Sequence, residues 1–349
     1  GRGFTFMNVG PKTVLNGLTI KGFNYRGLNA DEYSMGDDPN ISSGKNGIPV
    51  AGGGIICAMA SPTIKNCVII DCNIIGGNGA DGAGGGAEDP NGGHGGWPGF
   101  AYGGGIACLF DSHPAIINCT FRNCFANGGN AGDGGDGSEP NGLGGKGGGW
   151  YYTEDVNWPY GYHLGDVLGL SIEEEENPFY GVGGDGSYDA YTKYTGLGGA
   201  AYVGPDCAPT FTSCTFINNQ SFGGTSGICG IDGPSGLRRE PSINWQIDNF
   251  GGAVYCDTNS TPKFVDCEFT DNEAAPNYPA NNNDEYVSYG GAVAFEDGAA
   301  PTFEGCTFSG NQATIGGAMY LKEAVTLIDN CNFVDNSAYQ GGGLYCIYS

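Results

Sequence analysis

The chain has 349 residues, of which 39% are hydrophobic and 12% aromatic, so it holds enough apolar material for a long core. Its 68 glycines are far above the usual share of about 7%, yet they lack the strict third-residue period of collagen. With 13 basic and 38 acidic residues the net charge is −25, which argues against nucleic acid or an anionic membrane surface as a partner. No apolar run reaches the roughly 18 residues of a membrane span, so we expect no membrane insertion.

A repeated unit begins at the first residues. Phe4 to Val9 is a short apolar run that predicts the end of one coil, and the runs around Leu15 and Ile20 open a pattern that returns along the chain. The runs alternate in polarity, are separated by Gly, Pro and Asn, and lack a helical period, which is typical of β-strands. One column of the repeat reads Leu18, Cys67, Cys119, Cys214, Cys267, Cys306 and Cys331. Two residues on, the next column reads Ile20, Ile69, Phe121, Phe216, Phe269, Phe308 and Phe333.

Three more columns keep the same register. The first holds Leu15, Ile64, Ile116, Phe211, Phe264, Phe303 and Ile328. The second holds Phe23, Cys72, Cys124, Asn219, Asn272, Asn311 and Asn336. The third follows paired glycines and holds Ile55, Ile106, Ala201, Val254, Val293, Met319 and Leu344. Parallel in-register strands stack identical side chains, so each column predicts a ladder.

Two of these columns predict corners of the coil. Stacked Asn side chains can hydrogen-bond from one coil to the next, and Asn also tolerates a left-handed backbone. The paired glycines suit a second corner with positive φ or a close approach of the backbone.

The period is plainest between Gly290 and Cys346. Glycine-rich runs begin at Gly290, Gly316 and Gly341, which are steps of 316 − 290 = 26 and 341 − 316 = 25 residues. A period of this length is typical of solenoids, and three short strands per unit describe one coil of a parallel β-helix. We therefore predict an all-β, right-handed parallel β-helix of about seven to eight coils. The handedness follows from the preference of parallel crossovers, and we expect one domain over residues 1–349.

Insertions separate the coils, and all of them fall between the Asn corner and the next glycine pair. Their expected ranges are roughly 24–51, 76–102, 128–197, 223–250 and 275–289. They should therefore emerge from one edge of the solenoid, where repeat proteins often carry their binding surface. Neighbouring Gly-rich segments could form a sheet of extended strands with a three-residue period.

All four tryptophans lie in these insertions, and the longest insertion is rich in aromatic residues. If the protein has a ligand surface, we expect Trp150, Tyr152, Trp158 and Tyr162 to form it, because aromatic rings with a polar edge grip sugars and protein partners. The alternative is that these rings anchor the loop to the solenoid wall.

One motif pair recurs in the coils: Gly-Gly-Ala followed by an aliphatic residue, and then Phe-x-x-Asn. Gly251 to Val254 with Phe269 to Asn272 is one copy, and Gly290 to Val293 with Phe308 to Asn311 is another. This pair resembles the repeat of the chlamydial polymorphic outer-membrane proteins and of other large bacterial surface β-helix proteins. The resemblance implies surface display and adhesion.

The fourteen cysteines favour an oxidising compartment, although most stand in the inward columns. Successive cysteines of one ladder have parallel Cβ vectors that are too far apart for a disulfide without distortion, so buried thiols are the simpler interpretation. The better disulfide candidates are Cys72 with Cys124, at the corner of adjacent coils, and Cys207 with Cys229.

Calcium is the one cofactor that the sequence suggests. Asp133, Asp136 and Glu139 offer oxygen ligands on a Gly-rich segment, although solvated acidic loops explain the same pattern. Parallel β-helices also include polysaccharide lyases and hydrolases, and Gly93-His94-Gly95 matches a short polygalacturonase motif. The partner motifs of that family are missing, so we expect no catalytic residues and treat a carbohydrate-binding or polysaccharide-degrading protein as the alternative.

We therefore expect an extracellular or cell-surface structural and adhesive protein that forms fibres or multi-coil assemblies. Both ends of the chain fall inside the repeat, which indicates either a piece of a longer solenoid or head-to-tail self-association, and we favour the second. Surface glycans or other surface proteins are the further partners that we expect.

Overall fold

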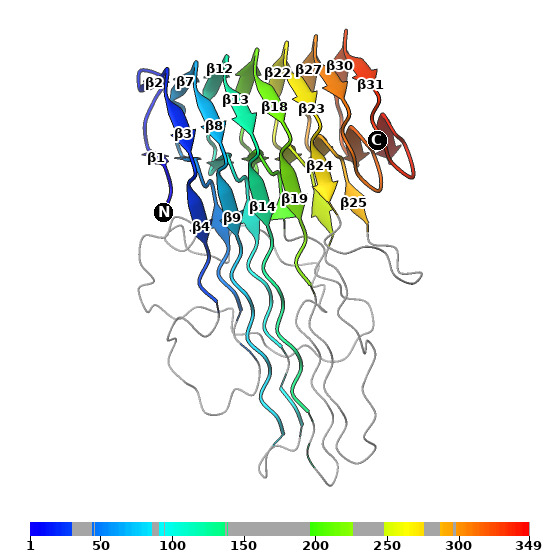
Figure 1. Ribbon diagram of the computed structural model, residues 1–349. Helices are drawn as coiled ribbons and strands as arrows, with labels where there is room; N and C mark the ends of the chain where they lie inside the picture. Colours follow the sequence, from blue (N-terminus) through cyan, green and yellow to red (C-terminus); the bar gives the residue numbers. More distant parts are fainter. Residues whose placement is uncertain are drawn as a thin grey trace.

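The structure is a computed structural model of the whole chain. It describes residues 1–29, 44, 46–85, 91–93, 95–136, 138, 196–225, 248–275, 287–295 and 298–348. Short parallel strands form five stacked sheets, which we call A to E in the order in which the chain passes through them in one coil (Figure 1). No helix occurs in these described ranges.

Three sheets surround the bore of the coil. Sheet A contains β1 (Phe4–Met7), β6 (Ile55–Ala58), β11 (Ile106–Leu109), β16 (Ala201–Val203), β21 (Val254–Cys256), β26 (Val293–Phe295), β29 (Met319–Lys322) and β32 (Leu344–Ile347). Sheet B contains β2 (Val14–Asn16), β7 (Thr63–Lys65), β12 (Ala115–Ile117), β17 (Thr210–Thr212), β22 (Lys263–Val265), β27 (Thr302–Glu304) and β30 (Leu327–Asp329). Sheet C contains β3 (Thr19–Lys21), β8 (Val68–Ile70), β13 (Thr120–Arg122), β18 (Thr215–Ile217), β23 (Glu268–Thr270), β28 (Thr307–Ser309) and β31 (Asn332–Val334).

Two further sheets lie at the edge from which the insertions leave. Sheet D contains β4 (Asn24–Arg26), β9 (Asn73–Ile75), β14 (Phe125–Asn127), β19 (Gln220–Phe222) and β24 (Glu273–Ala275). Sheet E contains β5 (Val50–Ala51), β10 (Ala101–Tyr102), β15 (Gly196–Leu197), β20 (Asn249–Phe250) and β25 (Ser288–Tyr289). The coils that carry insertions thus have five short strands where the sequence predicted three. The expected insertion 24–51 accordingly includes β4 and β5, which belong to the coil.

The predicted apolar columns are ladders in the structure. Phe269 pairs with Phe308, and Phe308 pairs with Phe333, with ring centroids 4.7 and 4.9 Å apart. Phe211, Phe264 and Phe303 form a second stack at 4.9 Å per step. The two stacks meet edge to face, a favourable arrangement for aromatic rings. Together with the aliphatic and Cys columns they fill one continuous core.

The predicted Asn ladder is also present. Asn219, Asn272 and Asn311 are fully buried, and the Nδ2 of Asn272 donates to the Oδ1 of Asn311 at 3.0 Å. The left-handed backbone, however, occurs one residue earlier than expected, at positions such as Asn218 and Asp271. The physical reason is that two adjacent residues have different roles. The residue with positive φ turns the chain, and because of this turn the next side chain points into the coil.

The glycine pairs form the other corner, as expected. The first glycine of each pair, such as Gly251 (φ 63°) or Gly290 (φ 66°), has a left-handed backbone, which other residues adopt only with strain. The second glycine lies so close to the neighbouring coil that a Cβ on Gly291 would overlap the carbonyl oxygen of Gly317. Both of the reasons for glycine that the sequence suggested therefore apply, each to a different member of the pair.

Candidate functional site

The feature that distinguishes this solenoid is a bundle of Gly-rich segments that continues outward from sheets D and E (Figure 1). We call it the glycine bundle; its described residues are 27–29, 46–48, 76–85, 91–93, 95–99, 128–136 and 223–225. At its base, Val50, Ile74, Ala101 and Ala126 form a small apolar layer between sheets D and E. The insertions thus leave the coil together, at the single edge that the sequence predicted.

Hydrogen bonds in the bundle recur at every third residue. The N–H groups of Gly76, Gly79, Gly82 and Gly85 donate to the carbonyls of Asn127, Asn130, Asp133 and Asp136, at 2.7 to 2.9 Å. The segment 91–99, which returns to the coil, also donates at every third residue, from Gly93, Gly96 and Gly99 to the carbonyls of Ala83, Ala80 and Gly77. It also accepts bonds from Gly129, Gly132 and Gly135. A three-residue period is that of an extended threefold helix, and each segment therefore bonds to several neighbours around it.

The close approach of these segments explains their glycine content. A Cβ built on Gly132 would overlap the carbonyl oxygen of Ala80, and one on Gly79 would overlap that of Gly96. At Gly84, by contrast, the nearest atom is 3.7 Å from such a Cβ, which is an ordinary contact. Packing therefore demands glycine at most inward positions, and the possible threefold sheet of the sequence analysis is confirmed as a bundle.

Asn and Asp side chains join adjacent coils on the outside of the bundle. The Oδ1 of Asn78 accepts the N–H of Asn130 at 2.9 Å, and the Oδ1 of Asp81 accepts the N–H of Asp133 at 2.8 Å. One coil later, Asn130 accepts the N–H of Thr225. These side chains satisfy backbone donors that the glycine pattern leaves unpaired.

This arrangement bears on the calcium prediction. Asp133 and Asp136 are exposed and three residues apart on one segment, while Glu139 lies outside the described residues. Within the described part of the chain, no three His, Cys, Asp or Glu side chains are grouped so that they could hold a metal ion. Asp133 has a neighbour in Asp81, but the Oδ1 of Asp81 is already a hydrogen-bond acceptor for the backbone. Calcium binding therefore stays a prediction.

The cysteines that the structure describes are free thiols. Cys72 and Cys124 occupy the Asn column in adjacent coils, yet no disulfide joins them. Each Sγ instead donates to a carbonyl of the preceding coil, Cys72 to Ile20 and Cys124 to Ile69. The reason is the parallel register, which holds successive Cβ atoms about one strand spacing apart and therefore too far for a disulfide. Cys207 is likewise a free thiol, and Cys229 lies outside the described residues.

The environment of Cys207 and Cys267 makes these two thiols unreactive. Burial raises the pKa of Cys207 to about 12. A hydrogen bond with Cys214, together with burial, raises the pKa of Cys267 to about 12. Since the thiolate is the reactive form, these residues pack as small apolar groups with a weak donor and are poor nucleophiles at neutral pH.

An aromatic cluster that the sequence analysis missed lies on the outer side of sheet A, against sheet E. Tyr202 stacks on Tyr255 at 6.0 Å, and Phe250 stacks on Tyr289 at 4.5 Å. The Tyr202 hydroxyl donates to Asp257, and burial together with this carboxylate raises the pKa of Tyr202 well above its usual value. Part of the signal was present in the sequence, because Tyr202 and Tyr255 each stand one residue after an inward column position, Ala201 and Val254.

The aromatic residues predicted to bind a ligand, Trp150, Tyr152, Trp158 and Tyr162, lie outside the described residues. His94 of the polygalacturonase-like motif lies outside them too. The structure places the ends of the segments that lead into these stretches on the glycine bundle. It therefore shows where the insertions start, and the ligand role of the four rings stays a prediction.

Comparison with known proteins supports the fold. A family model described as a right handed beta helix region matches residues 195–349. No curated protein and no solved structure matches the chain. The described residues contain no helix with the length and apolar character needed to cross a membrane. The coils before residue 195 share the register of those after it, so the chain is a right-handed parallel β-helix.

Proposed function

We propose that this protein is an extracellular structural and adhesive protein in which the coil is a rigid base and the glycine bundle holds the insertions away from it. The observation that carries the proposal is the continuity of hydrogen bonding from sheets D and E into the bundle. A Gly-rich linker without such bonds would be a flexible coil. Here the same composition is ordered, so loops at its far end would be displayed at a fixed place.

The acidic composition and the fold support this role. A net charge of −25 favours a soluble, self-repelling surface. The ligands that we propose are surface glycans or other surface proteins, bound through Trp150, Tyr152, Trp158 and Tyr162. Aromatic rings suit both kinds of ligand because they bury apolar area and keep a polar edge.

The test is a binding measurement with the whole chain on immobilised glycans and on surface proteins of bacteria and host cells. We expect Trp158→Ala to weaken binding at least tenfold, since aromatic hot spots cost about 2 kcal/mol or more when truncated. Tyr339→Ala is the matched control, because Tyr339 is an aromatic residue with 85% exposure in the last coil. Equal binding by both variants and the parent chain would contradict the ligand assignment.

Head-to-tail assembly also remains a proposal. The last coil exposes Phe333 and Leu344, which occupy core columns, at 36% and 39%. Sheet A has eight strands, whereas sheets B and C have seven each. If a second copy continues all three sheets, its β2 and β3 pair with β30 and β31 of the first copy. Its β1 then has to occupy the position that β32 of the first copy holds beside β29. Negative-stain images should show fibres whose length grows with concentration, and short uniform particles would speak against this assembly.

A further inference from the structure

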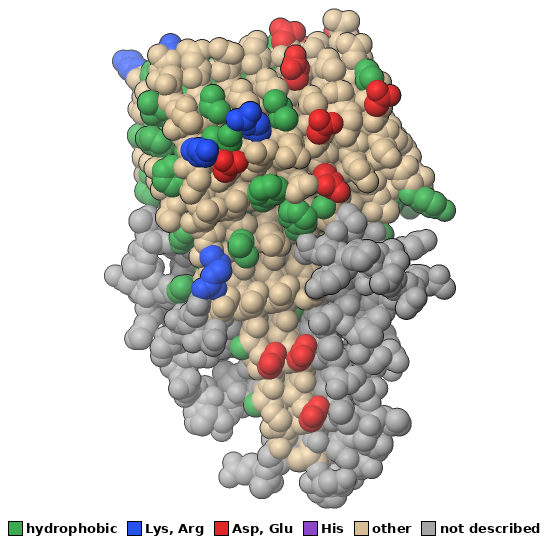
Figure 2. Space-filling model, viewed as in Figure 1, with side chains coloured by type: hydrophobic (Ala, Val, Ile, Leu, Met, Phe, Trp, Pro, Cys, Tyr) green, Lys and Arg blue, Asp and Glu red, His purple; other side chains and the backbone are tan. Residues whose placement is uncertain are grey.

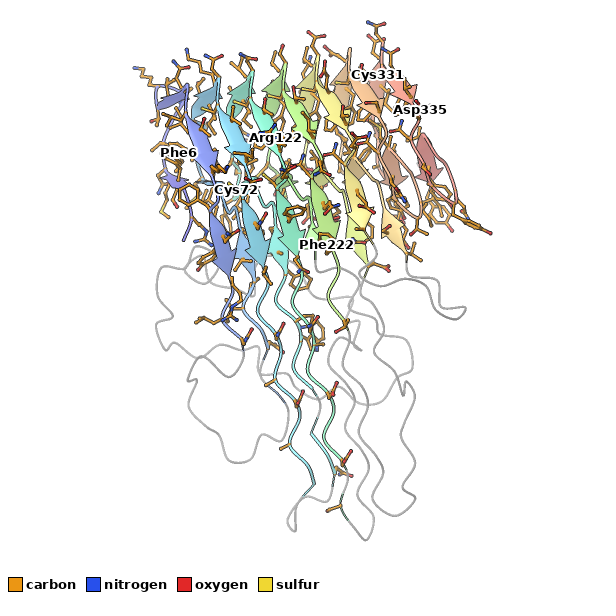
Figure 3. All side chains as sticks on the ribbon, in the orientation of Figure 1. Phe6, Cys72, Arg122, Phe222, Cys331 and Asp335 are labelled. Carbon is orange, nitrogen blue, oxygen red and sulfur yellow. The ribbon has the colours of Figure 1, made fainter. Side chains whose placement is uncertain are left out.

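The outer faces of the coil carry charge of opposite sign at their two ends. Toward the N-terminus, the basic residues of the strands and turns are Lys12, Lys21, Arg26, Lys65 and Arg122. Toward the C-terminus, the acidic ones are Asp266, Glu268, Asp271, Glu273, Glu304, Asp329 and Asp335. The separation is one of net charge, because Asp71 and Asp111 lie toward the N-terminus and Lys263 and Lys322 toward the C-terminus. Figure 2 shows this separation on the face it presents, and Figure 3 labels Arg122 and Asp335 on the two sides of it. The fourth coil, with β17 and β18, has no charged strand residue.

Sheet B makes this polarity self-complementary. The first and third residues of each of its seven strands point outward and form two columns. The first column reads Val14, Thr63, Ala115, Thr210, Lys263, Thr302 and Leu327. The second column reads Asn16, Lys65, Ile117, Thr212, Val265, Glu304 and Asp329. A twofold axis along β17 would place coil one over coil seven, coil two over coil six and coil three over coil five.

Three of the pairs that this axis creates match in character, whereas Lys263 would face Ala115. Val14 would meet Leu327, and both are exposed, at 52% and 55%. Ile117, which is 39% exposed, would meet Val265. Lys65 would meet Glu304, and no two like charges would face each other. Apolar pairs on either side of a complementary charged pair suit an isologous interface, in which the same patch of both copies meets.

In the dimer, Lys65 would gain an ion pair with Glu304 of the other copy. Within the described residues, Lys65 makes no ion pair, whereas Lys21 is 3.6 Å from Asp71 and Lys263 is 2.8 Å from Glu304. In the antiparallel pair, Glu304 would lie between Lys263 of its own copy and Lys65 of the other. Apolar contacts at the ends and in the third and fifth coils would flank this contact.

We propose that the outer face of sheet B is the interface of a dimer in which two copies pack side by side with their coil axes antiparallel. Six inter-coil steps of about 4.8 Å give a length of about 29 Å. Strands of three residues are about 10 Å wide, so the sheet alone gives roughly 300 Å² per copy, to which the flanking turns add. An interface of this size is typical of weak associations, and we expect this one to be salt-sensitive.

Residues on the twofold axis meet their own copies, which gives a direct test. In a chain that also carries Cys346→Ser, which removes the exposed native thiol, Thr212→Cys should form a disulfide-linked dimer on a non-reducing gel under mild oxidation. Thr215→Cys is the matched control, because it lies in the same coil on sheet C and should stay monomeric. Equal cross-linking of both variants, or none in either, would overturn the proposal.

Sedimentation equilibrium of the intact chain between about 1 and 500 µM measures the affinity itself. Lys65→Gln removes the ion pair with Glu304 and should raise the dimer Kd about threefold. Lys65→Glu places two like charges opposite each other and should raise the Kd about tenfold. Lys21→Glu, on sheet C, should leave the Kd unchanged while circular dichroism confirms the fold of every variant. A chain that stays monomeric at about 500 µM would overturn the proposal. Oligomers of unlimited size that Lys65→Glu does not affect would also overturn it, because they would be head-to-tail assemblies.

Discussion

Replacement of Asn272 by Ala tests whether the Asn ladder holds the coils together. The Oδ1 of Asn272 accepts two bonds from Asn219, from its backbone N–H at 3.0 Å and from its Nδ2 at 2.9 Å. The Nδ2 of Asn272 donates to the carbonyl of Phe216 at 2.9 Å and to the Oδ1 of Asn311 at 3.0 Å. The side chain of Asn272 therefore links three successive coils.

The expected cost follows from the groups that the alanine variant leaves without partners. The backbone N–H of Asn219 loses its acceptor and the carbonyl of Phe216 loses a donor, both in a fully buried region. Each buried unsatisfied group costs about 1–3 kcal/mol. We therefore expect Asn272→Ala to lower the free energy of unfolding by about 3 kcal/mol.

Asn272→Cys should fall between Ala and the parent chain, because Cys124 already occupies the same column in another coil. There the thiol of Cys124 donates to the carbonyl of Ile69, as the amide of Asn272 does to that of Phe216. A thiol offers this one weak donor but no good acceptor for Asn219. We expect a loss of about 1–2 kcal/mol.

Guanidinium unfolding followed by circular dichroism gives the stability, and hydrogen exchange of the Asn219 amide reports the local effect. Asn332→Ala is the matched control, since Asn332 is exposed on β31 and should change stability by about 0.5 kcal/mol or less. The reasoning is refuted if Asn272→Ala is as stable as the control, or if the Asn219 amide exchanges no faster.

Two other predictions concern the glycine bundle and the thiols. Gly132→Ala should speed hydrogen exchange and proteolysis in the bundle, because its Cβ would overlap the carbonyl of Ala80, whereas Gly84→Ala should leave both rates unchanged; equal rates would contradict the close packing. The raised pKa of Cys207, about 12, means that its unfolded thiol ionises near pH 9 while the folded one stays neutral, so the contribution to stability is complete below pH 9 and is lost as the pH rises toward 12. Thiol titration with a disulfide reagent should accordingly show Cys346, which is exposed, reacting in the native protein and Cys207 only after unfolding; rapid native labelling of Cys207 would contradict its burial.

The repeat itself could be predicted from the sequence because a coil contacts its neighbours through identical positions. The Phe column from Phe216 to Phe333 and the column from Phe211 to Phe303 appear in the structure as aromatic stacks. Parallel pairing in register leaves no choice of partner once the period is known, so local pattern and long-range contact coincide.

Other features needed the tertiary structure because they depend on contacts that no column reveals. The strands of sheets D and E are two or three residues long, too short for a pattern, and exist because adjacent coils align them. The left-handed residue, such as Asp271, was displaced by one from the expected position since the turn has to aim Asn272 inward. Gly-rich composition by itself favours a flexible chain, and only the packing of segments such as 76–85 and 128–136 against one another decides that these residues form an ordered bundle. The sequence alone determined the coil, because its period sets which residues pair. Only the tertiary structure decided that the Gly-rich insertions form an ordered bundle, because their hydrogen-bond partners belong to other coils.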